Sequence, residues 1–312
     1  MARRRRPSKP PTPPRPLPEG ELPSLAALEQ FSEASIAQWL QAAEALTALQ
    51  TQLFFGLELS RQQHTAELVE AIKVKLVPSQ PFEGWARIVE YRYCLEPLSV
   101  AGAIKGDGGR FNIGSGLDQA TFPSFPALYI AEDYPTSFRE RFGMGVDTNT
   151  DGLSSTDLAL RVPTSFTHVA LRGQLELIID VADTTALQPF SAVLKQFAIP
   201  NIVRLLSRRL NLRAPPMLVR SAAGLQKQLI HPNWRMFSAQ FDLPSNSQIF
   251  GRIAAAAGAH GIRYPSARQS GKFCMALFPQ NWRSSSSFVE ISDGAPSEAR
   301  LTRMDGKTTA LW

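Results

Sequence analysis

The period of the hydrophobic pattern changes at Pro81, and this change limits the folds that the chain can adopt. Between Ser24 and Leu53 apolar residues recur every three to four positions, the period of an α-helix, and similar spacing predicts a helix over 65–76 with Thr65 as its cap. After Pro81 the apolar runs are short and typical of strands, until helical spacing takes over at 187–258 and strands close the chain. This order favours an α+β fold over a regularly alternating parallel sheet.

These patterns divide the chain into three expected parts. We predict a disordered tail over 1–21, a helical extension over 22–80 and a main domain over 81–312, with a helical insertion at about 187–232. The apolar stripe of the extension either packs on the rest of the chain or docks into a groove of a partner. The strands predicted for the main domain cover 85–93, 127–131, 167–171, 175–181, 262–264, 272–278, 288–291 and 299–304, and its helices 187–197, 202–210, 217–230 and 247–258.

The first eighteen residues hold six cations, seven prolines and almost no apolar side chain. Such a segment cannot bury enough surface to offset the entropy of ordering. Its six cations equal the formal net charge of +6, so residues 17–312 sum to zero. The tail either binds nucleic acid or an acidic surface by counterion release, or only solubilises the protein. Prolines stand where an export signal needs an apolar segment, so no export signal is expected.

The composition argues against several classes of protein. Apolar stretches such as 53–57 and 253–257 are far shorter than the roughly 18 to 20 residues that cross a bilayer, so we expect no membrane span. Two cysteines, Cys94 and Cys274, supply no disulfide framework, which favours a reducing, cytoplasmic location. The four histidines lack the spacing of metal ligands, and no metal site is predicted.

A glycine-rich segment at 106–114, Gly-Asp-Gly-Gly-Arg-Phe-Asn-Ile-Gly, is the first candidate binding feature. Its glycines let the backbone approach a ligand closely while Arg110 points a guanidinium at it. That combination suits a phosphate beside a flat base. The spacing is neither that of a Walker A loop nor that of a Rossmann fingerprint, and on composition alone a plain glycine-rich hairpin explains it equally well.

Two further segments place charged groups at the ends of predicted strands. Arg92 stands between two tyrosines at the end of the strand 85–93, and it either faces an anion or lies on a solvated face. The strand 127–131 ends in acids, and Pro135 then begins a helix that places Glu140 about one and a half turns in. The alternative is that these carboxylates are ordinary surface acids.

The last segment is Gly-Ile-Arg-Tyr-Pro-Ser-Ala-Arg at 261–268. Pro265 is awkward inside a central strand, so Ser266 is displayed at a kink or an edge. A hydroxyl there can hold a ligand. It lacks the His and Asp partners, and the sharp turn, of a catalytic nucleophile.

Taken in order, these segments resemble one protein family. The arginine near a strand end, the Gly-Gly-Arg-Phe-Asn-x-x-Gly loop, the Leu-Tyr-x-Ala-Glu strand, a glutamate in the next helix and the Gly-x-x-Tyr-Pro-Ser-Ala-Arg segment leading to Cys-x-Ala-Leu-Phe are similar to a RES domain, named for Arg, Glu and Ser. The resemblance covers about 85–282. The chain departs from a minimal member in its helical extension before Trp85 and in the length between Glu140 and Ser266.

The resemblance implies an ADP-ribosyltransferase-like mixed β core with inserted helices and an N-terminal helical extension. It also implies an enzyme that breaks the nicotinamide–ribose bond of NAD, with phosphate (a phosphorylase) or water (a glycohydrolase) as acceptor. Members are commonly bacterial toxins held in check by a cognate antitoxin. NAD is then the substrate, and no further cofactor is expected. Carried over by motif, the catalytic residues are Glu140, Arg92 and Ser266, and the NAD-binding residues are Arg110, Tyr129, Gly109 and Asn112.

In this scheme Glu140 stabilises an oxocarbenium-like ribose, and the two arginines bind pyrophosphate or incoming phosphate. The expected partners are NAD, inorganic phosphate and an antitoxin protein, with no membrane and with nucleic acid bound at most weakly through the tail. Two other functions stay open. One is transfer of ADP-ribose to a protein or nucleic acid, and the other is a non-catalytic nucleic-acid-binding or scaffold protein that works through its Arg/Pro tail.

Overall fold

The computed structural model of the chain describes residues 33–143, 165–215, 218–292, 294–295 and 297–308. The chain divides into two compact units, 1–46 and 47–312. Of the first unit the structure describes 33–46, which are helical and begin α2 (Glu33–Gln63). Ile36, Trp39 and Leu40 of this unit are exposed. The predicted tail over 1–21 lies outside the described residues.

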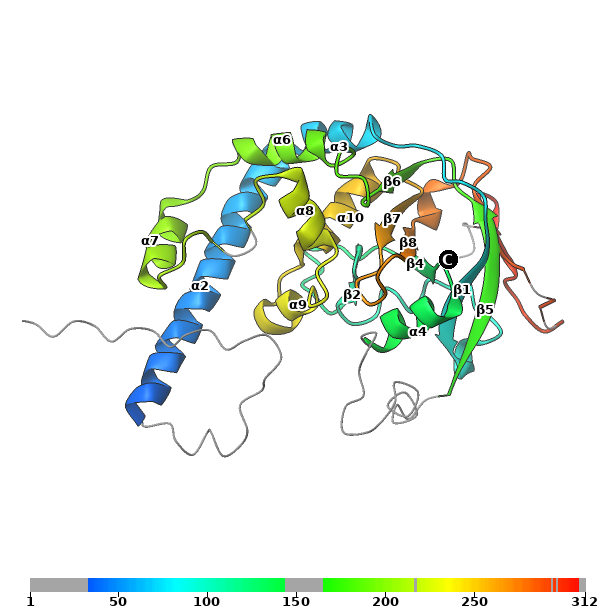
Figure 1. Cartoon of the computed structure of the whole chain (residues 1–312), viewed down its shortest axis with the longest axis horizontal. Coiled ribbons are helices and arrows are strands. Elements are labelled where there is room, and N and C mark those ends of the chain that lie inside the picture. Colours follow the sequence, from blue (N-terminus) through cyan, green and yellow to red (C-terminus); the bar gives the residue numbers. More distant parts are fainter. Residues whose placement is uncertain (1–32, 144–164, 216–217, 293, 296, 309–312) are drawn as a thin grey trace, which may run out of the picture. The chain divides into compact units, whose positions relative to one another are not determined.

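A mixed sheet lies at the centre of the second unit, and in its described part the sheet has eight strands (Figure 1). The order is β10-β9-β5-β1-β4-β8-β7-β6, and all neighbours are antiparallel except β6 and β7, which are parallel. The predicted α+β class is therefore confirmed. The strands are β1 (Phe82–Glu90), β4 (Leu128–Ala131), β5 (Phe166–Gln174), β6 (Ile178–Asp180), β7 (Gly261–Pro265), β8 (Phe273–Leu277), β9 (Phe288–Ile291) and β10 (Arg303–Asp305), and β2 (Gly108–Gly109) and β3 (Asn112–Ile113) form a separate hairpin.

Helices pack on one face of the sheet. In Figure 1 α3, α6, α8 and α10 gather beside β6 and β7, and their apolar side chains share one core with Ile262, Cys274 and Ala276 of the sheet. Ser245 caps α10 in a capping box with Gln248, which explains why this helix begins at Asn246. The helices of this unit beyond α2 are α3 (Thr65–Lys73), α4 (Tyr134–Phe142), α6 (Gln188–Gln196), α7 (Asn201–Arg209), α8 (Ala222–Leu229), α9 (Met236–Phe241) and α10 (Asn246–Ala256).

A second core covers the other face, and the alternation of side chains divides the strands between the two. Leu128 and Ile130 of β4 lie in the second core together with Trp282, whereas Tyr129 and Ala131 belong to the first. This alternation places Tyr129 on the face that carries the candidate site.

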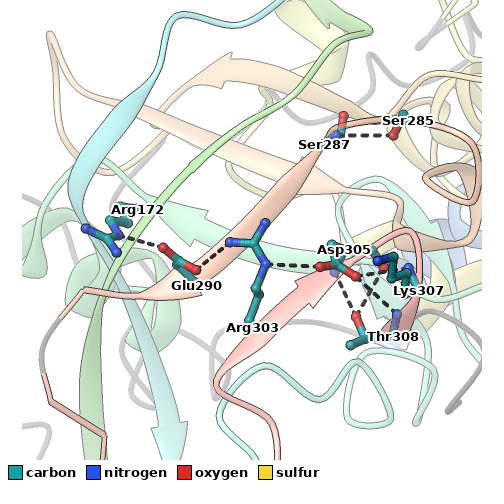
Figure 2. Close-up of polar contacts among 8 residues, drawn as sticks. All are labelled: Arg172, Ser285, Ser287, Glu290, Arg303, Asp305, Lys307 and Thr308. Atoms are coloured by element: carbon teal, nitrogen blue, oxygen red, sulfur yellow. Dashed lines mark hydrogen bonds and ion pairs between the residues drawn. The ribbon is translucent and has the colours of Figure 1, made fainter.

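At one end of the sheet a chain of ion pairs links three strands (Figure 2). Glu290 of β9 accepts from Arg172 of β5 at 2.7 Å and from Arg303 of β10 at 2.6 Å. Arg303 also donates to Asp305 at 3.0 Å, and Asp305 in turn accepts from the backbone of Lys307 and Thr308. These contacts give the short strand β10 side-chain links in addition to its backbone pairing.

Helices α2 and α3 lie within the predicted extension at 22–80. Leu49 and Leu53 of α2 are buried and Leu57 packs on the helical core, so this part of the apolar stripe is covered within the chain. The predicted cap of α3 was wrong. His64 occupies the N-cap position, and the Thr65 hydroxyl donates back to the carbonyl of Arg61.

The end of the strand 85–93 was also predicted wrongly. Strand β1 ends at Glu90, which pairs with Phe166, the first residue of β5, so the ladder runs out there. Tyr91–Tyr93 form a short 3₁₀ helix, η1, and Arg92 is therefore not on a strand. The helices α6, α7 and α8 fall within the predicted insertion at 187–232, and α9 follows it without having been predicted. The division into three parts stays a prediction.

Candidate active site

A cleft of about 500 Å³ opens in the second unit. Its walls come from β1, η1, the β2–β3 hairpin, β4, α4, β7, β8 and the segment Trp234–Arg235 before α9. This volume lies in the range of small-molecule sites. A second hollow, lined by Leu57, Phe190 and Phe250 among others, measures about 40 Å³ and is too small for a dinucleotide.

Glu140 projects into the cleft from the last turn of α4. Asp133 caps this helix by accepting from the backbone of Thr136 at 2.8 Å, and Gly143 ends it with a φ of 70°. One carboxylate oxygen of Glu140, Oε1, accepts from Ser266 Oγ at 2.6 Å and from the backbone of Ala267 at 2.9 Å. Two donors on one oxygen fix the plane of the carboxylate.

The other oxygen, Oε2, lies 4.0 Å from the guanidinium of Arg110, and the Glu140 side chain is 20% exposed. The other carboxylates that line the cleft have closer cations: Glu90 is paired with Arg92 and Arg141, and Glu96 with Arg300. Within the described residues Glu140 is therefore the lining carboxylate that is held rigidly but not neutralised by a close ion pair.

Ser266 stands behind Glu140 rather than in the cleft wall. Its residue follows the end of β7, as the sequence predicts, and its oxygen also accepts from the backbone of Arg268 and Gln269 at 3.1 and 3.0 Å. Ser266 is not among the residues that line the cleft. Its position suits a role in orienting the Glu140 carboxylate.

Arg110 occupies the turn of the β2–β3 hairpin and is 5% exposed. Its guanidinium donates to the carbonyl of His231 at 2.8 Å and lies 5.9 and 5.8 Å from the ring centres of Trp234 and Tyr264. Backbone and aromatic neighbours thus hold the charge in place without cancelling it. The glycine-rich segment is a hairpin, as one of the two interpretations predicted, and Gly108, Gly109 and Arg110 line the cleft.

Gly109, Tyr129 and Asn112 hold the hairpin against the sheet. A side chain at Gly109 would collide with the Tyr129 ring, so only glycine fits there. The Tyr129 hydroxyl accepts from the backbone of Phe111 at 2.8 Å and donates to Asn112 at 2.9 Å, and burial raises the pKa of this phenol. Gly109 and the Tyr129 ring line the cleft.

Asn112 is fully buried and does not line the cleft. Its amide donates to the carbonyls of Ala103 and Phe125, and its oxygen accepts from the backbone of Gly109 and from Tyr129. The hydrogen-bonding capacity of this side chain is therefore spent on the hairpin. This geometry offers no support for the predicted contact of Asn112 with NAD.

Arg92 lies at the rim of the cleft. Its side chain is 67% exposed, is paired with Glu90 at 2.5 Å and lies over the Tyr93 ring at 5.0 Å. The structure does not bring Arg92 into contact with Glu140, Ser266 or Arg110. A ligand would have to compete with Glu90 for it.

Arg87 is a cleft residue that the sequence reasoning missed. It lies in the middle of β1 and donates to the carbonyls of Pro97, Ser99 and Tyr129 at 2.8, 3.0 and 3.0 Å. Burial, with repulsion from Arg141, lowers the pKa of this guanidinium to about 10, so it stays charged at neutral pH. The sequence contains a signal for this residue. Charged side chains are rarely buried unless they are paired, so an arginine inside the apolar run 85–89 indicates specific hydrogen-bond partners.

Two further titratable groups of the wall, the Cys274 thiol and the Tyr264 phenol, are neutral at physiological pH. Burial and then the charge of Glu140 raise the pKa of the Cys274 thiol, which makes it a poor nucleophile. Burial likewise raises the pKa of Tyr264. In the described part of the chain, no group of three or more His, Cys, Asp or Glu side chains could hold a metal ion. No described helix is long and apolar enough to cross a membrane.

A family model of the RES domain matches residues 85–298, which is more than half of the chain. The chain belongs to the RES domain family. The matched region contains Arg87, Arg110, Glu140 and Ser266, and it leaves α2 and α3 outside. No curated protein matches the sequence. Among solved structures, a chain in the crystal structure of the M. tuberculosis MbcT-MbcA toxin-antitoxin complex is similar at 13% identity and a TM-score of 0.40, over 73% of this chain and 90% of that chain.

Proposed function

We propose that this RES domain degrades NAD by cleaving the bond between nicotinamide and ribose, as a phosphorylase or as a glycohydrolase. One observation carries the proposal: the Glu140 carboxylate is fixed by Ser266 and Ala267 through one oxygen, while its other oxygen remains without a hydrogen bond among the described residues. A negative charge held in this way, at the wall of a cleft of about 500 Å³, is suited to stabilise a positive charge that develops in a ligand.

The chemistry of NAD fits such a site. Nicotinamide leaves as a neutral molecule from a cationic pyridinium, so cleavage needs little acid catalysis. The difficult part is the oxocarbenium-like ribose that remains. A preorganised carboxylate lowers the energy of that cation and can also accept hydrogen bonds from the ribose hydroxyls. Glu140 is the residue that we assign to both tasks.

The guanidinium of Arg110 provides the opposite charge. It is held by the carbonyl of His231 and by two aromatic rings, which leaves the planar group able to bind phosphate oxygens. The rings of Tyr129 and Tyr264 add flat apolar surface to the same cleft. We expect the dinucleotide to place its pyrophosphate toward the arginine and its nicotinamide ribose toward Glu140.

We further propose that the protein acts as a toxin whose activity is restrained by an antitoxin protein, as is common in the family. An inhibitor that blocks the cleft would explain how a cell tolerates an enzyme that consumes NAD. This part rests on family membership, and no surface of the described residues is assigned to the antitoxin.

The deciding experiment is incubation of the purified protein with NAD, with and without inorganic phosphate, followed by separation of nicotinamide, ADP-ribose and ADP-ribose 1″-phosphate. A phosphorylase gives the 1″-phosphate only when phosphate is present, and a glycohydrolase gives ADP-ribose in both cases. Label from NAD that stays on a macromolecule would point to ADP-ribose transfer instead. Intact NAD after prolonged incubation with folded protein would refute the proposal.

A further inference from the structure

The connection between α8 and α9 reaches from the predicted insertion into the cleft. The carbonyls of Leu229 and His231 accept from Arg110 at 3.4 and 2.8 Å, and Trp234 is 5% exposed. Both Trp234 and Arg235 line the cleft. The predicted insertion at 187–232 therefore reaches the site through Leu229 and His231, and the residues that follow it line the cleft.

Two guanidinium groups lie near the indole ring of Trp234. The central carbon of Arg235 lies 4.6 Å from the centre of the indole, and that of Arg110 lies 5.9 Å from it. One aromatic ring of the α8–α9 connection thus lies near two cations, Arg110 and Arg235, which are far apart in the sequence. Cation–π attraction to the indole ring favours these positions of both guanidinium groups.

The cleft concentrates positive charge around this ring. Arg110, Arg141 and Arg235 all line it, and burial followed by repulsion from the other two lowers the pKa of Arg235. Arg141 is paired with Glu90 at 3.1 Å, and Arg92 is paired with the same carboxylate. No hydrogen bond or ion pair involves the Arg235 side chain within the described residues. Arg110 lies 4.0 Å from Glu140. An anion that binds between Arg235 and Arg110 would offset the repulsion between these two like charges.

We propose that Arg235, together with Arg110, forms a binding subsite for a phosphate oxyanion that the connection between α8 and α9 adds to the cleft. Planar guanidinium groups bind tetrahedral phosphates through paired hydrogen bonds, and two of them on one ring can engage separate oxygens. The subsite rests on the proposed function for its source of phosphate, which is either the pyrophosphate of NAD or the inorganic phosphate acceptor.

The test measures phosphate binding separately from turnover. Sodium pyrophosphate, inorganic phosphate and ADP-ribose are titrated by calorimetry into the full chain and into Arg235→Ala, Arg235→Gln and Arg235→Lys. Arg208→Ala is the matched control, because Arg208 is an exposed arginine of α7 that does not line the cleft. We expect Arg235→Ala to weaken pyrophosphate and ADP-ribose binding about 10-fold or more, Arg235→Lys to weaken it less, and Arg208→Ala to leave it unchanged.

A turnover experiment then identifies the source of the phosphate. If Arg235 binds the pyrophosphate, Arg235→Ala lowers kcat/KM for NAD but not for nicotinamide riboside, which has no phosphate. If it binds the acceptor, the KM for inorganic phosphate rises with either substrate.

Unchanged affinity of Arg235→Ala and Arg235→Gln for all three probes would overturn the subsite, whether or not the protein consumes NAD. Conversely, Arg235-dependent pyrophosphate binding in a protein that leaves NAD intact would uphold the subsite and refute the proposed function. Arg235→Gln keeps the aliphatic part of the side chain and Arg235→Lys keeps its charge, so the test does not depend on the alanine variant being folded.

Discussion

Replacing Glu140 with Gln is the sharpest test of the candidate site, because the structure dictates how the amide would sit. Ser266 Oγ and the backbone of Ala267 both donate to Oε1, so the amide oxygen must occupy that place. The amide nitrogen then replaces Oε2, which lies 4.0 Å from Arg110. The substitution keeps the shape and both hydrogen bonds and removes one negative charge.

The magnitude follows from what is lost and what is kept. Deleting one preorganised electrostatic group from an active site costs about 2.7 to 4 kcal/mol in the transition state, so kcat should fall about 10² to 10³-fold. Both hydrogen bonds persist as neutral contacts, so the free energy of unfolding should change by about 1 kcal/mol or less. Turnover should therefore suffer far more than stability, and the affinity for ADP-ribose should stay within a few-fold of the wild type.

The assay is nicotinamide release from NAD, followed by chromatography, with thermal unfolding measured on the same samples. Glu132→Gln is the matched control. Glu132 also accepts a backbone hydrogen bond, from Phe273 at 3.0 Å, but it does not line the cleft. A Glu140→Gln variant that binds ADP-ribose and releases nicotinamide at the wild-type rate would show that this carboxylate is not the group that stabilises the ribose cation.

Three further predictions test the support around the site and the edge of the sheet. Ser266→Ala removes the 2.6 Å hydrogen bond to Glu140 but keeps the one from Ala267, so kcat should fall about 10-fold with little change in KM. Ser266→Thr should restore most of the kcat. Loss of stability with kcat intact would mean that the serine is only structural. Asn112→Ala leaves buried polar groups without their hydrogen-bond partner, namely those of Gly109, Ala103, Phe125 and Tyr129. Urea unfolding should therefore show a free energy of unfolding that is lower by about 3 kcal/mol or more. A decrease of less than about 1 kcal/mol would contradict the importance of this hydrogen-bond network. Hydrogen bonds from Arg303 and then from Arg172 lower the pKa of Glu290 from its ordinary value of 4.5 (Figure 2). The ion pairs of Glu290 therefore stabilise the fold above pH 4.5, and this contribution is lost as the pH falls through the lowered pKa. Glu290→Gln should therefore lower the free energy of unfolding by about 0.5 to 1 kcal/mol at pH 7 and by progressively less as the pH falls below 4.5, and equal melting temperatures of the two proteins at pH 7 would argue against it.

Local signals in the sequence predicted the parts of the site that depend on local structure. Pro135 predicts the start of α4, and its spacing to Glu140 needs no tertiary information. The two glycines before Arg110 predict a tight hairpin. In the structure, the positive φ of 89° at Gly108 and the contact of Gly109 with Tyr129 exclude other residues at these positions. Both features were found from residue types alone.

The parts that the sequence did not predict depend on contacts between distant segments. Arg87 is tolerated inside β1 because carbonyls of Pro97 and Ser99, ten and twelve positions later, turn back to receive it. The local pattern of Arg92 is that of a strand residue. The ladder between β1 and β5 nevertheless ends at the pair Glu90–Phe166, and this limit is set by β5 and not by the local pattern. The same holds for Trp234, whose neighbour Arg110 lies more than a hundred positions away.

The motif residues of this RES domain divide by what they touch. Glu140, Arg110 and Gly109 line the cleft, whereas Ser266 and Asn112 bind the residues that do. An unsupported carboxylate or guanidinium would sample many rotamers and would have to be ordered when the ligand binds, at a cost in free energy. Ser266 and Asn112 already hold their partners by hydrogen bonds in the free protein, so these partners are ordered during folding and not when the ligand binds. Loss of a supporting residue should therefore reduce turnover through disorder of the charged group, whereas loss of a cleft residue should do so through the missing charge. Restoring only the hydroxyl, as in Ser266→Thr, should rescue the first kind of variant, but no neighbouring change should rescue Glu140→Gln.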